Sequence, residues 1–285
     1  MKKWLLRHMK CLTFSKKQHI SQTILLLKGA NKLRFFELGE ENNPAIVLIH
    51  GYGVSWKMWQ PHIEILKKDY RLIVPALPGH DLGEKSTFLS VEDTARQIND
   101  YIQANLQGKV RGMIGCSLGG TIAVEIMAQG QIQSEIVIID AGPVEAISKP
   151  LRHVFAWIRT LQNRLIRKGN KTVLNALTNS YFTMEAVEDL LKTAEHMSVE
   201  TCRNVQFSVF GYTVPDTIAK SGARFVYWYG SKEAILLKKS VRTFAKYVPG
   251  ATIQVFEGYN HGELVVSNPD LFVKNATMVI NSNPS

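Results

Sequence analysis

Residues 115–120 read Gly115-Cys116-Ser117-Leu118-Gly119-Gly120, between an apolar run at 109–115 and a helical pattern at 118–128. A serine between a strand and a helix, with glycines two residues before and after it, fits a tight turn in which larger side chains would clash. Such a turn raises the hydroxyl above the sheet and directs the first helical amides toward a reacting atom. The alternative is a glycine-rich loop that only packs the helix close to the sheet. The position favours Ser117 as a catalytic nucleophile.

Strands and helices alternate on both sides of this stretch. A mostly parallel sheet with helices on both faces is the fold class that this alternation predicts. Eight strands are expected, at residues 23–28, 33–38, 45–50, 71–75, 109–115, 135–140, 223–229 and 252–256. The first two flank turn residues and are expected to form a hairpin. Helices are expected at 56–67, 90–106, 118–128, 236–248 and 271–280.

The alternation lapses between residues 143 and 222, where nothing indicates a buried strand. Apolar residues recur there at the spacing of one helix face, namely Leu151, Val154, Phe155, Ile158, Leu161 and Leu165. We therefore expect three parts. Residues 1–21 form a basic N-terminal extension, residues 22–142 and 223–285 form the α/β core, and residues 143–222 form an inserted helical cap.

A serine hydroxyl needs a base, and His261 is the best placed of the histidines. It lies in Gly258-Tyr259-Asn260-His261-Gly262-Glu263, directly after the last expected strand. Catalytic groups in open α/β sheets gather at the carboxyl ends of the strands. His261 is therefore the predicted general base.

An acid that orients this histidine is expected between Ser117 and His261 in the sequence. Glu233 follows the penultimate strand in Tyr229-Gly230-Ser231-Lys232-Glu233 and would share the sheet edge with His261. Its carboxylate could fix the imidazole tautomer and stabilise the imidazolium. Asp140, at the end of the strand at 135–140, is the rival. We favour Glu233 because Asp140 is followed at once by Ala-Gly-Pro and the cap.

An oxyanion in an acyl-transfer site needs hydrogen-bond donors. The backbone amide of Leu118, directly after the serine, is one candidate. The amide of Tyr52, in His50-Gly51-Tyr52-Gly53 after an apolar strand, is the second. We expect His50 itself to have a structural role.

With these motifs in order, the chain resembles the α/β-hydrolase superfamily over about residues 22–142 and 223–282. The resemblance rests on HGYG at 50–53, PGHD at 78–81, GCSLGG at 115–120, YGSKE at 229–233 and NHGE at 260–263. It implies the triad Ser117, Glu233 and His261, the oxyanion hole of Tyr52 and Leu118, and a helical cap at 143–222.

Two features depart from the family pattern. Relatives commonly continue Pro78-Gly79-His80 with Gly-x-Ser, whereas residues 81–86 here read Asp-Leu-Gly-Glu-Lys-Ser. The acid is Glu233 where Asp is commoner. The serine nucleophile argues against the haloalkane dehalogenases and epoxide hydrolases of this fold, which use aspartate.

The net charge of +10 is concentrated in two stretches. Residues 1–20 contain only basic charged residues, and no acid occurs between Glu145 and Glu185. Such stretches suit a solvated face, an anionic membrane surface or an anionic substrate. They lack the motifs and interleaved aromatic residues of nucleic-acid binding.

Other whole-chain features indicate a cytoplasmic protein that is at most peripheral to a membrane. Cys11, Cys116 and Cys202 are too few for a disulfide framework, and the first 20 residues lack the apolar length of a secretory signal. We find no apolar run of about 18 residues. No metal-binding or phosphate-loop motif occurs, so neither metal nor cofactor is expected.

The resulting hypothesis is a serine hydrolase of carboxylic esters that forms an acyl-enzyme on Ser117. A thioesterase or a carbon–carbon bond hydrolase of the same fold is the first alternative, and a non-catalytic ligand receptor is the second. Fold alone does not decide between them.

Overall fold

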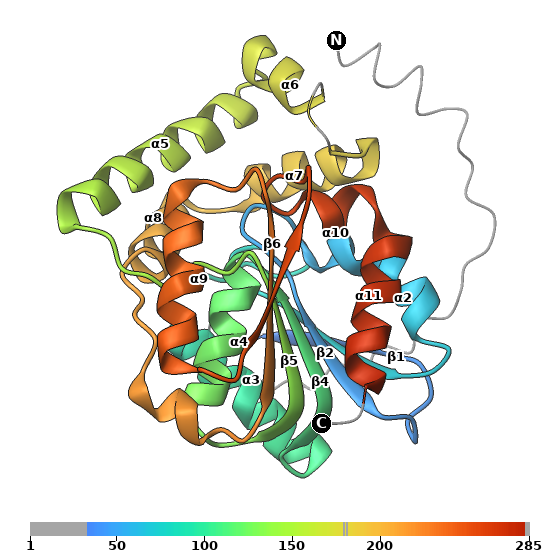
Figure 1. Ribbon diagram of the computed structural model, residues 1–285. Helices are drawn as coiled ribbons and strands as arrows, with labels where there is room; N and C mark the ends of the chain where they lie inside the picture. The colour runs from blue at the N-terminus through green and yellow to red at the C-terminus, as the bar shows by residue number, and fades with distance from the viewer. Residues whose placement is uncertain (1–32, 179, 181, 283–285) are drawn as a thin grey trace.

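The computed structural model describes residues 33–282 except residues 179 and 181. The centre of this part is a seven-stranded sheet in the order β1-β3-β2-β4-β5-β6-β7 (Figure 1). Only the β1–β3 pair is antiparallel. The strands are β1 (Arg34–Leu38), β2 (Ala45–Ile49), β3 (Arg71–Ala76), β4 (Lys109–Cys116), β5 (Gln133–Asp140), β6 (Arg224–Gly230) and β7 (Thr252–Phe256).

The predicted fold class, a mostly parallel α/β sheet, is confirmed. The described part contains seven of the eight expected strands, so the count of eight stays a prediction. The expected strand at 23–28 and the predicted extension at 1–21 lie outside the described residues. Strand β1, which was expected in a hairpin with residues 23–28, pairs with β3 here.

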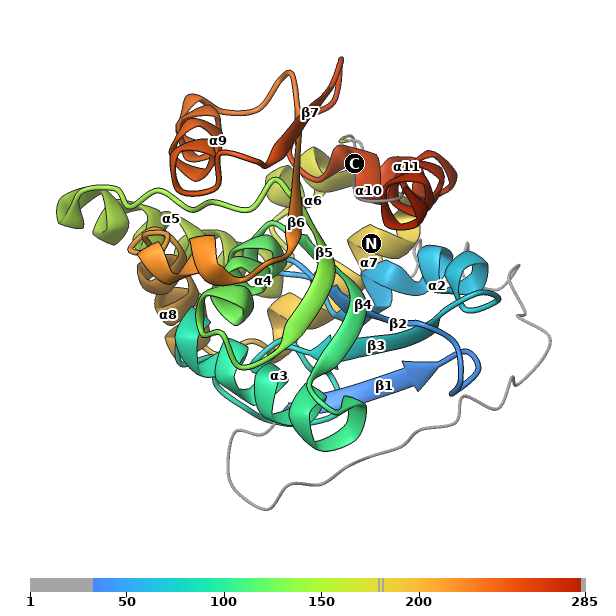
Figure 2. The same ribbon diagram turned by 60° about the horizontal axis from the view of Figure 1, so that its bottom comes forward.

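Helices cover both faces of the sheet because successive strand residues point to opposite sides (Figure 2). In β2, Val47 and Ile49 face the core under α3 (Val91–Leu106), α4 (Leu118–Ala128) and α9 (Ile235–Tyr247). Ile46 and Leu48 face the core under α2 (Gln60–Leu66), α10 (Glu263–Ser267) and α11 (Pro269–Asn281). Each face therefore buries its own apolar core.

The helix expected at 56–67 differs in its first turn. Trp56–Trp59 forms a 3-10 helix, η2, and α2 begins at Gln60 with Pro61 in its first turn. Proline lacks an amide hydrogen and suits the start of a helix, so the α-helix begins there. The N-cap expected at Ser90 is present, since its Oγ accepts a hydrogen bond of 3.1 Å from the Asp93 amide.

The chain between β5 and β6 is helical, as expected for residues 143–222. Its elements are α5 (Lys149–Arg167), α6 (Lys171–Thr178), α7 (Met184–His196), α8 (Val199–Val209) and the 3-10 helix η3 (Asp216–Lys220). Figure 1 shows α5, α6 and α7 beyond the carboxyl ends of the strands. No helix within the described ranges is long and apolar enough to cross a membrane.

Helix α4 lies so close to the sheet that the glycines around its start have no room for a side chain. A Cβ atom added to Gly119 would lie 2.1 Å from the carbonyl oxygen of Ile49 in β2. A Cβ atom added to Gly115 would lie 2.2 Å from the carbonyl oxygen of Gly119. The glycine spacing of the 115–120 motif is therefore required by the contact between helix and sheet.

We expect Gly119→Ala to lower the free energy of unfolding by about 2 kcal/mol or more, because the methyl group must displace backbone atoms. Urea denaturation measures this change. Gly250→Ala is the matched control, since nothing lies within 4 Å of its added Cβ; its effect should stay within about 0.5 kcal/mol. Equal effects of the two substitutions would contradict the close approach of α4.

Candidate functional site

Ser117 occupies a strained turn between β4 and α4. Its backbone has φ 52° and ψ −115°, a conformation that non-glycine residues rarely adopt. The turn is held by hydrogen bonds at both ends: the Ser117 amide donates to the carbonyl of Asp140 at 2.7 Å, and the Gly120 amide donates to the carbonyl of Ser117 at 2.9 Å. Strain retained in this way is typical of functional sites.

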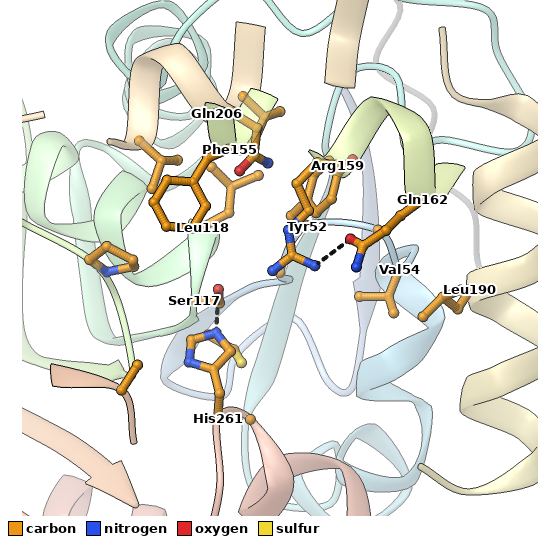
Figure 3. A pocket seen from close by; sticks show the side chains of 18 of the residues that line it. Tyr52, Val54, Ser117, Leu118, Phe155, Arg159, Gln162, Leu190, Gln206 and His261 are labelled. Carbon is orange, nitrogen blue, oxygen red and sulfur yellow. Dashed lines mark hydrogen bonds between the residues drawn. The ribbon is translucent and has the colours of Figure 1, made fainter. Parts of the chain in front are cut away.

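The side chain of Ser117 begins a hydrogen-bonded chain of three residues. Its Oγ lies 2.9 Å from Nε2 of His261, and Nδ1 of His261 lies 3.1 Å from Oε2 of Glu233 (Figure 3 shows the first contact). With Nδ1–H donating to the carboxylate, Nε2 accepts from the hydroxyl. The Glu233 side chain is 2% exposed, whereas that of His261 is 47% exposed. The structure thus brings together the three predicted triad residues.

The loops after β6 and β7 hold Glu233 and His261 side by side. The Ser231 amide donates to the carbonyl of Phe256 at 3.0 Å, and the Lys232 amide donates to the carbonyl of Tyr259 at 3.1 Å. Oε2 of Glu263 accepts from the amide of Asn260 at 2.8 Å and braces the histidine loop. The position of His261 therefore depends on backbone contacts between the two loops.

Asp140, the rival acid, lies near the triad but has different contacts. It is paired in register with Cys116 at the ends of β5 and β4, and its carboxyl lies against the Cys116 thiol. Burial raises the pKa of Asp140 to about 7, although the charge of His261 and the Cys116 thiol act in the opposite direction. The carboxyl that the structure places in hydrogen-bond contact with Nδ1 of His261 is that of Glu233.

The two predicted amide donors border the same space as Ser117. Tyr52, Leu118 and Ser117 all line one pocket. A Cβ atom added to Gly51 would lie 3.5 Å from Cβ of Ser117, so the loop at 50–53 runs directly beside the serine. Leu118 is the first residue of α4, and its amide has no acceptor within the helix.

The histidines at 50 and 80 brace the loops around this pocket. Nε2 of His50 accepts from the Leu77 amide at 3.1 Å, and Nδ1 pairs with the carbonyl of Gly51 at 2.9 Å. This geometry agrees with the structural role expected for His50. Burial lowers the pKa of His50 to about 4 and that of His80 to about 3, so both rings are neutral near pH 7.

The loop at 78–86, which departs from the family pattern, is closed by its own hydrogen bonds. The Gly79 amide donates to Oγ of Ser86 at 3.0 Å. Asp81 accepts from the Gly83 amide at 2.9 Å and forms an ion pair with Arg34. The inserted residues therefore leave the loop anchored to β1.

A cavity of about 750 Å³ opens above Ser117. The helical segment forms much of its wall, with α5 supplying Phe155, Arg159, Gln162, Asn163 and Ile166. The apolar row expected on one face of α5 divides in the structure: Phe155 lines the cavity, whereas Leu151, Val154, Ile158 and Leu161 are exposed. The face of α5 that borders the cavity carries both Phe155 and Arg159.

Sequence reasoning missed the roles of three residues. Asp189 of α7 accepts from both the amide and the hydroxyl of Ser55 at 2.6 Å, which ties the helical segment to the loop after β2. Arg159 was considered only as one member of the basic stretch between Glu145 and Glu185, although it follows Phe155 by one helical turn. Gln206 lines the cavity from α8, and no sequence signal distinguished it.

Cysteines and metal ligands add nothing further to the site. Cys116 and Cys202 are free and buried, and Cys11 lies outside the described residues. No group of three potential ligands among residues 33–282, the gaps excepted, is placed to hold a metal ion.

The raised pKa of Asp140 predicts a specific pH dependence of stability. Its carboxyl stays protonated in the native state to about pH 7 but ionises near pH 4 when unfolded. Between these values the native state holds the extra proton, so wild-type stability falls as pH rises. Asp140→Asn should remove this loss. Relative to wild type, its unfolding free energy should rise by about 2–4 kcal/mol from pH 4 to pH 7.5. Urea denaturation at each pH measures the difference, and parallel profiles would contradict the assignment.

A model of the alpha/beta hydrolase family matches residues 46–275. The dihydrolipoyllysine-residue acetyltransferase component of the acetoin cleaving system of Pseudomonas putida is 30% identical over 58% of this chain and 44% of its own length. The pimeloyl-[acyl-carrier protein] methyl ester esterase of Vibrio campbellii is 31% identical over 39% of this chain and 42% of its own length. The chain thus spans less than half the length of these curated relatives.

The solved structure of the carboxylesterase CesB of Bacillus subtilis shares the fold. It superposes with a TM-score of 0.69 at 17% identity, over 99% of this chain and 98% of its own. The family model covers most of the present sequence, including every residue of the hydrogen-bonded chain at Ser117. The protein therefore belongs to the alpha/beta hydrolase family.

Proposed function

We propose that the protein is a serine hydrolase of carboxylic esters that works through an acyl-enzyme on Ser117. The observation that supports this most is the hydrogen-bonded chain from Ser117 through His261 to Glu233, which faces the cavity. The esterases among its relatives and structural neighbours agree with this activity.

In the first half of the proposed reaction, His261 Nε2 takes the proton of Ser117 as Oγ attacks the ester carbonyl. The amides of Tyr52 and Leu118 donate hydrogen bonds to the resulting oxyanion. Glu233 accepts from Nδ1–H throughout and stabilises the imidazolium. His261 then gives its proton to the leaving alcohol, and the acyl group remains on Ser117.

In the second half, His261 removes a proton from a water molecule that attacks the acyl carbonyl. The same two amides hold the second oxyanion, and the proton returns to Oγ as the acid leaves. The half-exposed ring of His261 leaves room for this water. We infer that residues 143–222 act as the cap that selects the acyl group, since they supply much of the cavity wall.

Ser117→Ala should lower kcat for short-chain p-nitrophenyl esters at least about 10³-fold, because it removes the nucleophile on which His261 and Glu233 act. Release of p-nitrophenol measures the rate. Ser148→Ala is the control, because Ser148 caps α5 without a side-chain hydrogen bond and does not line the cavity. A loss of less than tenfold in Ser117→Ala would contradict the assignment.

Rates on matched esters and thioesters, together with ligand affinities, separate the alternatives. A thioesterase would hydrolyse acyl thioesters with a kcat/KM far above that for matched esters. A non-catalytic receptor would bind such compounds without hydrolysing them, and Ser117→Ala would leave its ligand affinity unchanged.

We further propose that α5 attaches the protein to an anionic membrane surface, consistent with a peripheral protein of the cytoplasm. Exposed apolar side chains support this, above all Trp157 at 66%, Val154 at 49% and Leu151 at 47% exposed. Figure 1 shows α5 at the periphery of the molecule. The helix contains arginine and lysine but no acid, and an amphipathic helix of this kind binds anionic interfaces.

Sedimentation with phosphatidylglycerol vesicles tests this attachment. Wild type should sediment with them in low salt and much less with phosphatidylcholine or in high salt. Trp157→Glu should reduce binding at least about fivefold, whereas Met278→Glu, which changes a comparably exposed residue of α11, should not. Vesicle binding that does not depend on lipid charge would contradict the proposal. So would a wild type that does not bind vesicles but forms a dimer that Trp157→Glu dissociates.

A further inference from the structure

Arg159 is a cationic side chain that lines a largely apolar cavity and is also exposed to solvent. It lies on the cavity-facing row of α5, one turn after Phe155 and one turn before Gln162. Figure 3 shows its guanidinium group inside the pocket, on the same side as Tyr52 and facing the space above Ser117. Burial raises the pKa of Tyr52, and the positive charge of Arg159 partly offsets that increase, which places the charge beside the phenol.

No carboxylate within the described ranges lies within ion-pair distance of Arg159. Its described hydrogen bond is to Oε1 of Gln162 at 3.0 Å, which engages one of its donors. The two acids of the cavity wall are engaged elsewhere: Glu145 pairs with Lys239, and Glu233 with His261. The guanidinium therefore has several donors and its full charge available to a ligand.

Gln206 supplies a second polar group to the same cavity. It belongs to α8, is only 4% exposed, and lines the pocket. Its side-chain amide makes no hydrogen bond to any residue in the described part of the chain. Figure 3 shows it near Phe155, on the cavity wall formed by α5 and α8.

We infer that the substrate is an anionic ester, whose carboxylate is bound by Arg159 while its ester carbonyl lies at Ser117. A guanidinium group matches a carboxylate with two parallel N–H···O bonds. The amide of Gln206 offers a further donor on the same wall. The predicted class is half-esters of dicarboxylic acids, in preference to neutral fatty-acid esters. This inference rests on the proposed ester hydrolysis at Ser117.

Methyl esters of straight-chain acids with four to eight carbons, with and without a terminal carboxylate, provide the test. The measured quantity is the ratio of kcat/KM for the anionic ester to that for its neutral partner. Arg159→Gln should lower this ratio at least about tenfold, through loss of charge-assisted hydrogen bonds. Gln206→Leu should lower it about threefold or more.

Arg164→Gln is the matched control, because Arg164 lies on the same helix and is exposed as Arg159 is, but does not line the cavity. Its ratio should equal that of wild type. An unchanged ratio in Arg159→Gln, or an equal fall in Arg164→Gln, would overturn the inference.

A binding measurement separates this inference from the proposed reaction. Calorimetry on Ser117→Ala, which cannot form an acyl-enzyme, gives the Kd of the anionic half-ester without turnover. Adding Arg159→Gln should raise that Kd at least about tenfold. Ester hydrolysis with no dependence on Arg159 would overturn the carboxylate site alone. Arg159-dependent binding without hydrolysis in wild type would support the carboxylate site and overturn the proposed reaction.

Discussion

The strained backbone of Ser117 is the constraint on which the rest of the site depends. Its φ of 52° exists only because α4 is pressed against β2 and β4, where glycines at 115 and 119 leave no space for a side chain. The Ser117 amide is also fixed to the carbonyl of Asp140. A relaxed turn would lower the hydroxyl and turn the Leu118 amide away from the cavity. The packing of the core between α4 and the sheet offsets the free-energy cost of this conformation.

The parallel sheet then determines which groups meet the serine. Strands β4, β6 and β7 end at one edge, so Ser117, Glu233 and His261 converge although 144 residues separate the serine from the histidine. Two carboxyls could compete for the imidazole at this edge. Burial keeps Asp140 protonated to about pH 7, whereas Glu233 forms the hydrogen bond to Nδ1. The different environments of the two carboxyls thus support the roles that we propose: Glu233 orients His261, and Asp140 is a buried carboxyl outside the triad.

Local patterns were enough to predict the parallel sheet and the residues that meet at its edge, because turn chemistry and strand ends are local properties. The orientation of α5 could not be predicted from its periodicity. Its apolar row predicted one buried side, yet in the helix packed against α7 and α8 only part of that row, with Phe155, borders the cavity, whereas Leu151 and Val154 are exposed. Such a rotation depends on contacts between distant segments. The same holds for Asp189, whose bond to Ser55 spans 134 residues.

The central claim is that Glu233, acting through His261, activates Ser117. The rate at which a fluorophosphonate probe forms an adduct, followed by intact mass, tests it most directly. We predict a single adduct on wild type, a rate about 10²-fold to 10⁴-fold lower in Glu233→Gln, and a rate within a few-fold of wild type in Asp140→Asn. Melting temperatures would verify that both variants are folded. Equal labelling rates in folded Glu233→Gln and wild type, or a wild type that forms no adduct, would contradict the account.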